Sequence, residues 1–155
     1  MSVPGIPSLY YGSEWGIAGR KDASSDAPLR PALSPAKLRR QAPHPDLHAT
    51  LKRLAALRRR YPALRHGGYR PVHVSHEQLA FTRSGPMGHA LVAVNAAGEP
   101  RRIEVELPTA LEARWVDVLN QQTFEGSQGR LDLPLDACWG RILVPQSAVR
   151  PAREN

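Results

Sequence analysis

The chain has 155 residues and a formal net charge of +7, and 41% of its residues are apolar and 23% charged. This composition is typical of a globular domain, and the length falls well short of the roughly 250 residues of a complete (β/α)8 barrel. No apolar run approaches the roughly 20 residues of a membrane span, so we expect no membrane partner. The first residues show no secretory signal, and the single cysteine, Cys138, favours a reducing compartment. We therefore expect a cytoplasmic protein.

The positive charge is concentrated in one segment. Residues 20–70 hold 13 lysines and arginines and only three aspartates, whereas residues 71–155 hold eight basic and ten acidic residues. The basic segment has no interleaved aromatic residues and no helix-turn-helix or RNA-binding signature. We therefore expect a solvated basic helix face and no nucleic-acid partner.

The first 45 residues predict one short strand and one long loop. Apolar and aromatic residues from Ile6 to Gly12 predict a strand that ends in a turn. Residues 16–45 show neither a period of 2 nor a period of 3.6, and their prolines disfavour any helix. Loops of this length are usually functional or disordered.

One helix is predicted after this loop. Asp46 stands at the N-cap position, and apolar residues then recur at spacings of three and four, at Leu47, Leu51, Leu54, Leu57 and Tyr61. Arg58, Arg59 and Arg60 complement the negative end of the helix dipole before Pro62 ends the helix.

From residue 66 onward the pattern changes to short strands separated by glycine and proline turns. The predicted strands cover residues 69–74, 78–83, 90–95, 102–107, 115–119, 131–133 and 138–144. Ile103 and Val105 alternate with Glu104 and Glu106, which predicts a strand with one face in water. We therefore predict a mainly β fold, with an antiparallel β-sandwich over residues 66–145 and a flexible tail over residues 146–155.

Residues 5–31, GIPSLYYGSEWGIAGRKDASSDAPLRP, resemble the segment at the eighth barrel strand of the α-amylase superfamily of glycoside hydrolases. Gly5-Ile6-Pro7, Tyr11-Gly12, Glu14 and Gly16 stand in the family's order, and Asp26 and Arg30 match its acidic residue and the arginine four positions on. The likeness continues through LHATLKRLAALRRRYPALRHGGYRPV, which resembles the eighth barrel helix, and through LAFTR, ALVAVNAA and LDLPLDACWGRILV, which are similar to sandwich strands. The resemblance implies that residues 1–65 are a barrel remnant (last strand, rim loop and last helix) and that residues 66–145 are the C-terminal sandwich.

The resemblance implies a C-terminal fragment of an α-glucan-acting hydrolase or transglycosylase, close to the cyclomaltodextrinase, neopullulanase and α-glucosidase group. In this family the catalytic Asp, Glu and Asp come from barrel strands four, five and seven. None of those strands is predicted in this chain, so we assign no catalytic residue and expect the chain to be inactive alone. The expected partner is an α-glucan or maltooligosaccharide in the intact enzyme, with no cofactor. No metal is expected, because His73 and His76 fit no zinc signature.

Three residues are candidate substrate contacts. Asp26 and Arg30 can form charge-assisted hydrogen bonds with sugar hydroxyls, and the resemblance implies contacts just on the non-reducing side of the cleavage point. An ion pair that shapes the loop is the alternative role for these two residues. Trp15, on the rim loop, is a candidate for stacking on a sugar ring, whereas Trp115 and Trp139 are expected in the core.

Two functions of other classes stay open. The first is a carbohydrate-binding β-sandwich that works without catalysis. The second is an interaction protein that self-associates through the barrel remnant. A lone barrel strand has two unpaired edges, and the apolar face of the predicted helix must be covered by something.

Overall fold

The computed structural model describes residues 1–108 and 113–149 of the chain. Contacts divide the chain into two compact units. We call residues 1–5 and 57–155 the sandwich unit, and residues 6–56 the loop-helix unit. None of the described helices is long and apolar enough to cross a membrane.

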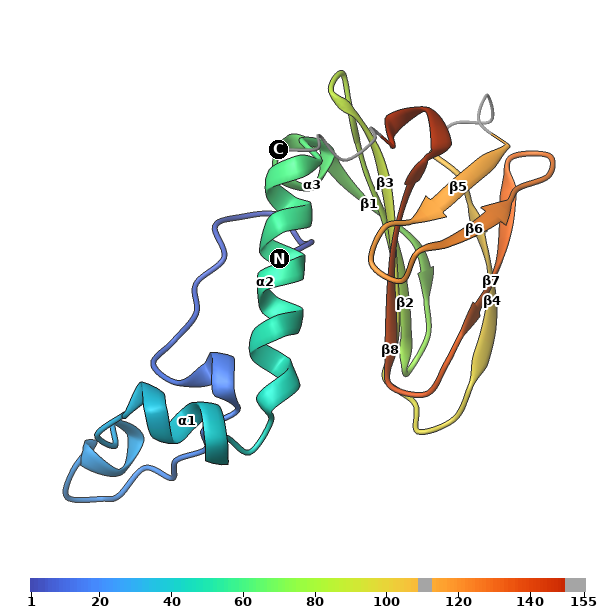
Figure 1. Ribbon diagram of the computed structural model, residues 1–155. Coiled ribbons are helices and arrows are strands. Elements are labelled where there is room, and N and C mark those ends of the chain that lie inside the picture. Colours follow the sequence, from blue (N-terminus) through green and yellow to red (C-terminus); the bar gives the residue numbers. More distant parts are fainter. Residues whose placement is uncertain (109–112, 150–155) are drawn as a thin grey trace. The chain divides into compact units, whose positions relative to one another are not determined.

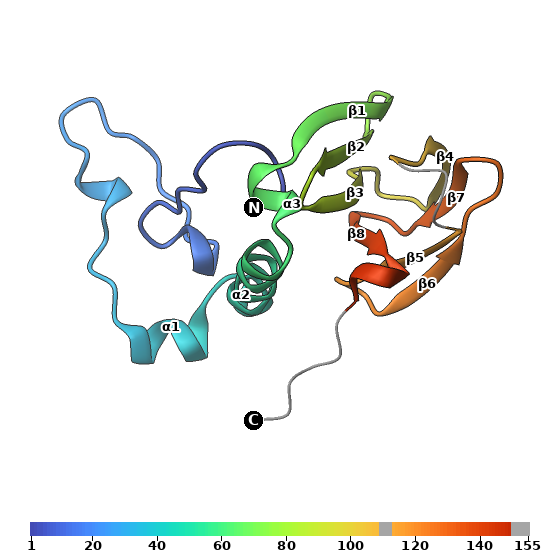
Figure 2. The same ribbon diagram turned by 90° about the horizontal axis from the view of Figure 1, so that it is seen from above.

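Antiparallel strands build the sandwich unit (Figure 1). Within the described residues they are β1 (Gly68–Val74), β2 (Gln78–Gly85), β3 (Gly88–Asn95), β4 (Arg101–Glu106), β5 (Arg114–Asp117), β6 (Gln122–Glu125), β7 (Arg130–Leu135) and β8 (Trp139–Pro145). Six of them form one sheet in the order β1-β2-β3-β8-β5-β6, and β4 pairs with β7 in a second sheet. Seen from above, the long sheet curves around β4 and β7 (Figure 2). The predicted mainly β, antiparallel fold is confirmed.

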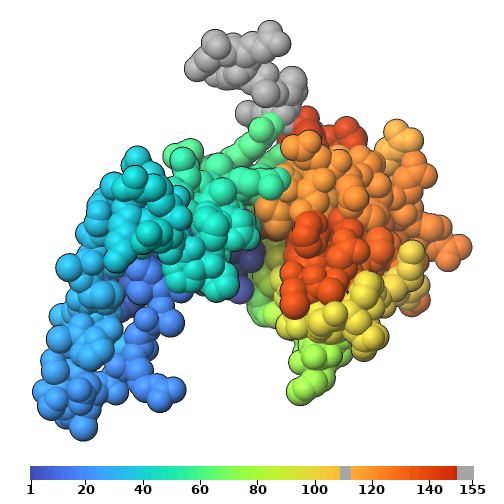
Figure 3. Space-filling view, turned by 60° about the horizontal axis from the view of Figure 1, so that its bottom comes forward, coloured from blue at the N-terminus to red at the C-terminus, as the bar shows by residue number. Residues whose placement is uncertain are grey.

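Apolar side chains from both sheets form one shared core. Leu91 and Leu143 come from the long sheet and Leu131 and Leu133 from the short one, and each is at most 1% exposed. Trp115, on β5, is fully buried among them, as predicted. Burying an apolar side chain of this size contributes about 1.5–3 kcal/mol, so this core is the main source of stability in the sandwich. In the space-filling view the orange and red atoms of the last strands form one closely packed surface (Figure 3).

One ion pair lies inside the sandwich. Arg141 Nη1 donates to Asp117 Oδ2 at 2.9 Å, and the two side chains are 4% and 0% exposed. Asp117 Oδ1 also accepts hydrogen bonds from the backbone N–H groups of Leu119, Asn120 and Ile142. The Asp117 carboxylate therefore shapes the turn after β5 and ties this turn to β8.

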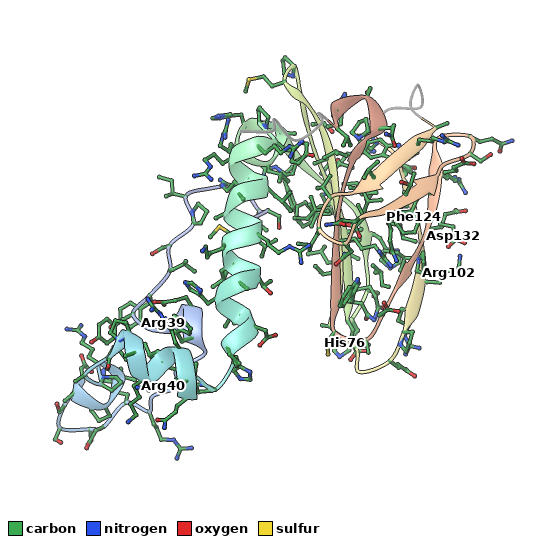
Figure 4. All side chains as sticks on the ribbon, viewed as in Figure 1. Arg39, Arg40, His76, Arg102, Phe124 and Asp132 are labelled. Carbon is green, nitrogen blue, oxygen red and sulfur yellow. The ribbon has the colours of Figure 1, made fainter. Side chains whose placement is uncertain are left out.

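Exposed ion pairs cover the outer face of β4 and β7. Arg102 lies beside Asp132, and Arg130 Nη1 lies 2.8 Å from Glu104 Oε1 (Figure 4). Glu104 is exposed while its neighbour Ile103 is buried, as the predicted alternation requires. Surface pairs of this kind each contribute about 0–1 kcal/mol, so their main effect is on solubility and register.

The helices precede the strands in the chain. They are α1 (Pro35–Gln41), α2 (Pro45–Arg60) and α3 (Ala63–His66), with short 3-10 turns η1 (Ser13–Trp15), η2 (Ala27–Leu29) and η3 (Gln146–Ala148). The helix predicted after the loop is α2. It begins at Pro45, so Asp46 lies in its first turn instead of at the N-cap, and the three arginines lie in its last turn as predicted. Arg39 and Arg40 project from α1 (Figure 4).

Two predictions for the first 45 residues are wrong. The strand predicted over residues 6–12 does not form: no described strand pairs with this segment, and unpaired backbone groups do not sustain a strand. The prolines do not exclude a helix either, because Pro35 occupies the first turn of α1, where a missing N–H costs nothing. Ser34 caps this helix by accepting a hydrogen bond from the Lys37 N–H at 3.5 Å.

Three features of the sandwich also differ from or extend the predictions. The four-residue strand β6 was absent from the predicted set, because its sequence Gln-Thr-Phe-Glu is mostly polar. Trp139 is not a core residue: it begins β8 and is 40% exposed. In the predicted tail, residues 146–148 form η3, and residues 150–155 lie outside the described residues.

Candidate substrate-contact loop

Two neighbouring tyrosines close the loop that carries the predicted contacts. Tyr11 Oη donates to the carbonyl of Pro31 at 3.0 Å, and Arg30 Nε donates to Tyr10 Oη at 3.2 Å. Each bond joins residues 20 positions apart. The loop between them therefore starts and ends at one place within the loop-helix unit.

Two glycines of the family-like motif are required by the backbone. Gly12 and Gly16 flank η1, with φ angles of 77° and 70°, in the left-handed region that favours glycine. A Cβ atom at Gly16 would also lie 2.5 Å from His44 Cδ2. These two positions of the motif therefore require glycine, because the chain makes a tight turn that packs against the start of α2.

Trp15 is held by a ring contact inside the same unit. Its indole stacks on the His48 ring of α2, with ring centroids 4.5 Å apart and planes 5° from parallel. The backbone N–H of His44 also donates to the Trp15 carbonyl at 3.4 Å. One indole face is therefore occupied by His48, so a sugar ring could stack only on the opposite face.

Asp26 and Arg30 stand at the two ends of one 3-10 turn. Asp26 is the N-cap of η2 and Arg30 its C-cap, so the four-residue spacing of the motif corresponds to this turn. The two side chains have different partners: Asp26 Oδ1 lies 3.9 Å from Lys21 Nζ, whereas Arg30 binds Tyr10. The Asp26 side chain is 58% exposed. The alternative of an ion pair between Asp26 and Arg30 is therefore not what shapes this loop.

Asp22 builds the turn that precedes Asp26. Its Oδ1 accepts hydrogen bonds from the Ser24 N–H at 3.1 Å and from the Ser24 hydroxyl at 3.2 Å. These bonds favour the ionised form and lower the pKa of the Asp22 carboxyl from its ordinary value. Asp22 is thus engaged in local structure.

A cavity that the sequence did not predict lies beside the loop. Its volume is about 540 Å³, and its walls come from residues 16–18, 31–34, 37–38, 41 and 43–44. None of the three predicted contact residues is among them. Ile17, Leu33 and Leu38 make the wall largely apolar. The cavity was missed because it depends on α1, which the loop composition concealed.

The acidic side chains of the sandwich strands, and Glu99 in the turn before β4, are engaged by arginines. Ion pairs of 4 Å or less hold Glu99, Glu104, Glu106, Asp117, Glu125 and Asp132. Among the described residues no group of three His, Cys, Asp or Glu side chains is placed to hold a metal ion. What the loop can do chemically is form hydrogen bonds with a polyol through Asp26 and Arg30.

No known family model matches the chain. The sequence is 31% identical over 145 residues to neopullulanase 2 of Thermoactinomyces vulgaris, a match that covers 92% of this chain and 24% of that protein. Ttha1563 from Thermus thermophilus superposes with a TM-score of 0.78 and 33% identity, over 93% of this chain and 29% of that one. The α-amylase from Geobacillus thermoleovorans, solved in complex with acarbose, shares the fold with a TM-score of 0.76 and 22% identity, over 92% of this chain and 30% of that one.

The sandwich and the motif on the loop before it are therefore similar to one portion of a class of longer enzymes. More particularly, the chain is homologous over about nine tenths of its length to a portion of α-amylase-family enzymes. The chain spans about a quarter to a third of the length of these relatives. The resemblance to this family is confirmed.

Proposed function

We propose that this chain is the C-terminal part of an α-glucan-acting glycoside hydrolase or transglycosylase. In this proposal residues 1–65 supply the rim loop and the last helix of a (β/α)8 barrel, together with the segment that becomes its last strand only when the neighbouring barrel strands pair with it. Residues 66–145 form the supporting sandwich. The observation that carries the proposal is the match of 145 residues to about a quarter of a neopullulanase. A match of this extent includes residues of both units.

The surface of the loop-helix unit supports this proposal. Of residues 6–56, all of which the structure describes, only Gly12 is buried. Ile6 is 97% exposed and Tyr10 58%, and α2 contains no buried residue in spite of its leucine stripe. Apolar surface of this extent favours a partner, and the other strands and helices of a barrel would cover it. A second copy of this chain is the alternative cover, through self-association.

Asp26 and Arg30 are the proposed substrate contacts. The carboxylate accepts hydrogen bonds from sugar hydroxyls and the guanidinium donates to them, and both groups stand at the ends of η2. Trp15 adds the indole face opposite His48 as a stacking surface. The substrate class, an α-glucan, is taken from the neopullulanase and amylase relatives.

The proposal predicts that the chain alone is inactive and that it completes a truncated relative. The purified chain should release no reducing sugar from maltodextrin. Mixed with T. vulgaris neopullulanase 2 that lacks the matched segment, the chain should restore hydrolysis. Turnover by the chain alone that survives rigorous purification would reject the proposal, as would a stable but inactive complex.

Variants of the complemented enzyme test the contacts. Asp26→Asn and Arg30→Lys should each lower kcat/KM by about 10- to 100-fold, the effect of losing a charged hydrogen bond of about 1.5–3 kcal/mol. Asp22→Asn is the matched control, because Asp22 lies on the same loop and its carboxylate is engaged by neighbouring groups of the turn, chiefly Ser24. Equal effects of all three variants would assign the loss to loop structure.

A second candidate function is a carbohydrate-binding module. The self-contained core of the sandwich favours it, because such a unit can act without a barrel. Titration with maltooligosaccharides, followed by tryptophan fluorescence, separates the two candidates. The leading proposal expects no saturable change for the chain alone, whereas a binding module would show saturation.

We also propose a reducing, cytoplasmic compartment. Cys138 is the chain's single cysteine and is an exposed free thiol at the turn before β8. Its Sγ lies 3.7 Å from the Ala97 carbonyl, the distance of a weak hydrogen bond. An exposed unpaired thiol is better preserved where disulfides do not form.

A further inference from the structure

Two arginines of the sandwich unit enclose the first five residues of the chain. Arg58, in the last turn of α2, donates from Nη1 to the Met1 carbonyl at 2.8 Å and from Nη2 to the Gly5 carbonyl at 2.6 Å. Arg83, on β2, donates from Nη1 to the Ser2 carbonyl at 2.6 Å. Both guanidinium groups therefore bind the backbone of this segment.

The same two arginines hold the corner between α3 and β1. The Leu64 carbonyl accepts from Arg58 Nη1 at 2.6 Å and from Arg83 Nη1 at 3.1 Å, so it joins the two side chains. Arg83 Nε and Nη2 donate to the Gly67 carbonyl at 3.0 and 2.8 Å. Carbonyls at the end of a helix carry partial negative charge and lack partners within the helix, so they suit a cation.

Backbone carbonyls alone balance these charges in the described part of the chain. No described carboxylate forms an ion pair with Arg58 or Arg83. Arg83 is 1% exposed, and burial, together with the nearby Arg58 charge, lowers the pKa of its guanidinium. Five N–H groups in a rigid planar fork can satisfy carbonyls from several directions at once, which the three donors of a lysine ammonium cannot do.

The bonds of Arg58 lie where residues 6–56 begin and end. Gly5 is the last residue before the loop-helix unit, and Leu57 is the first residue after it. Arg58 follows Leu57 directly and binds Gly5, so it joins the two places where residues 6–56 leave and re-enter the sandwich unit. Holding the ends of so long a segment together opposes the chain entropy that would separate them.

We infer that Arg58 and Arg83 form a clamp that holds together the two points of the sandwich unit between which residues 6–56 run, and that they are positioning residues for the substrate contacts Asp26 and Arg30 on that segment. The clamp stands on the contacts alone, whereas the positioning role rests on the proposed function. Both ends of the segment are then fixed by two side chains, one on α2 and one on β2.

Backbone order parameters from ¹⁵N relaxation test the clamp in the full chain. In the unchanged protein Val3 and Gly5 should show the values of rigid backbone, about 0.85, and in Arg58→Lys and Arg83→Lys they should fall below about 0.6. Arg59→Lys is the matched control, because it is the same substitution one position along, at an exposed side chain. Amides of β3 report whether the sandwich stays folded.

Unchanged order at Val3 and Gly5 in Arg58→Lys, with β3 intact, would overturn the clamp. If Arg83→Lys fails to fold, Arg58→Lys decides alone, because Arg58 is only half-buried and lies outside the sandwich core. In the complemented neopullulanase, Arg58→Lys should raise KM for maltodextrin several-fold over Arg59→Lys. An unchanged KM together with lost order would overturn the positioning role. Failed complementation with the expected loss of order would reject the proposed function and leave the clamp.

Discussion

The sandwich unit and the loop-helix unit use leucine in opposite ways. In the sandwich, Leu91 and Leu143 are fully buried between two sheets. In the loop-helix unit, Leu51 and Leu54 on α2 stay half-exposed although their spacing is that of a regular apolar stripe. An apolar period therefore predicts a helix, but its leucines are buried only where another element packs against them.

The two units also differ in how they satisfy polar groups. The sandwich places a buried ion pair and a buried arginine among fixed partners, whereas residues 6–56 rely on short local bonds between exposed groups. Buried polar groups are costly to leave without a partner, and exposed ones exchange their bonds with water. We therefore expect substitutions in the two units to differ sharply in effect.

The largest effect should come from the ion pair inside the sandwich. Asp117→Ala leaves the Arg141 guanidinium buried without its carboxylate, and should lower the free energy of unfolding by about 3–5 kcal/mol. Urea unfolding followed by circular dichroism measures it. The control is Glu104→Gln, which breaks the exposed pair with Arg130 and should cost at most about 1 kcal/mol. Equal losses in both variants would contradict the claim that the buried pair contributes more to stability than the exposed pair.

Truncating leucines compares the two units directly. Leu143→Ala opens a cavity in the shared core and should cost about 2–5 kcal/mol. Leu51→Ala removes a half-exposed side chain from α2 and should cost no more than about 1 kcal/mol. The same urea experiment measures both variants. A similar loss for Leu51→Ala would show that α2 is covered by a core of its own.

Much of this fold could be predicted from the sequence where the signal is local. The apolar period of α2 and the alternation of Ile103 and Val105 with their glutamates predicted the correct elements. The strand predicted over residues 6–12 failed because a strand also needs a neighbour, which a local pattern does not report. Strand β6 and helix α1 were missed because polar or proline-rich composition concealed them.

Only part of the candidate site could be predicted from the sequence. The motif indicated Asp26 and Arg30, but their partners Lys21 and Tyr10 are known only from the folded loop. The clamp could not be predicted from the sequence. Arg58 was predicted only as a complement to the helix dipole, and its partners are backbone carbonyls, which carry no signature in the sequence.

Adding one methyl group at two glycines compares backbone packing in the two units. A Cβ at Gly67 would lie 2.6 Å from the Ala63 carbonyl oxygen, and a Cβ at Gly19 would lie 2.7 Å from the Pro28 carbonyl oxygen. Gly67→Ala should cost about 1–3 kcal/mol in thermal or urea unfolding, because α3 and β2 cannot move apart cheaply. Gly19→Ala also meets backbone atoms but should cost less than Gly67→Ala, at most about 1 kcal/mol, because Gly19 lies in an exposed loop. The reverse order would mean that the loop is the more rigid of the two regions.

The smallest effect concerns the protonation of Asp22. Its bonds from Ser24 place the folded pKa below the ordinary value of 3.8, so they support the turn above that pH, and this support is lost as the pH falls through the folded pKa. An NMR titration of the Asp22 carboxyl should show the lowered pKa, and Ser24→Ala should raise it part of the way back, because the Ser24 N–H still donates. Ser25→Ala is the control, since the Ser25 hydroxyl accepts from the Ala27 N–H. A pKa equal in Ser24→Ala and Ser25→Ala would contradict the assignment.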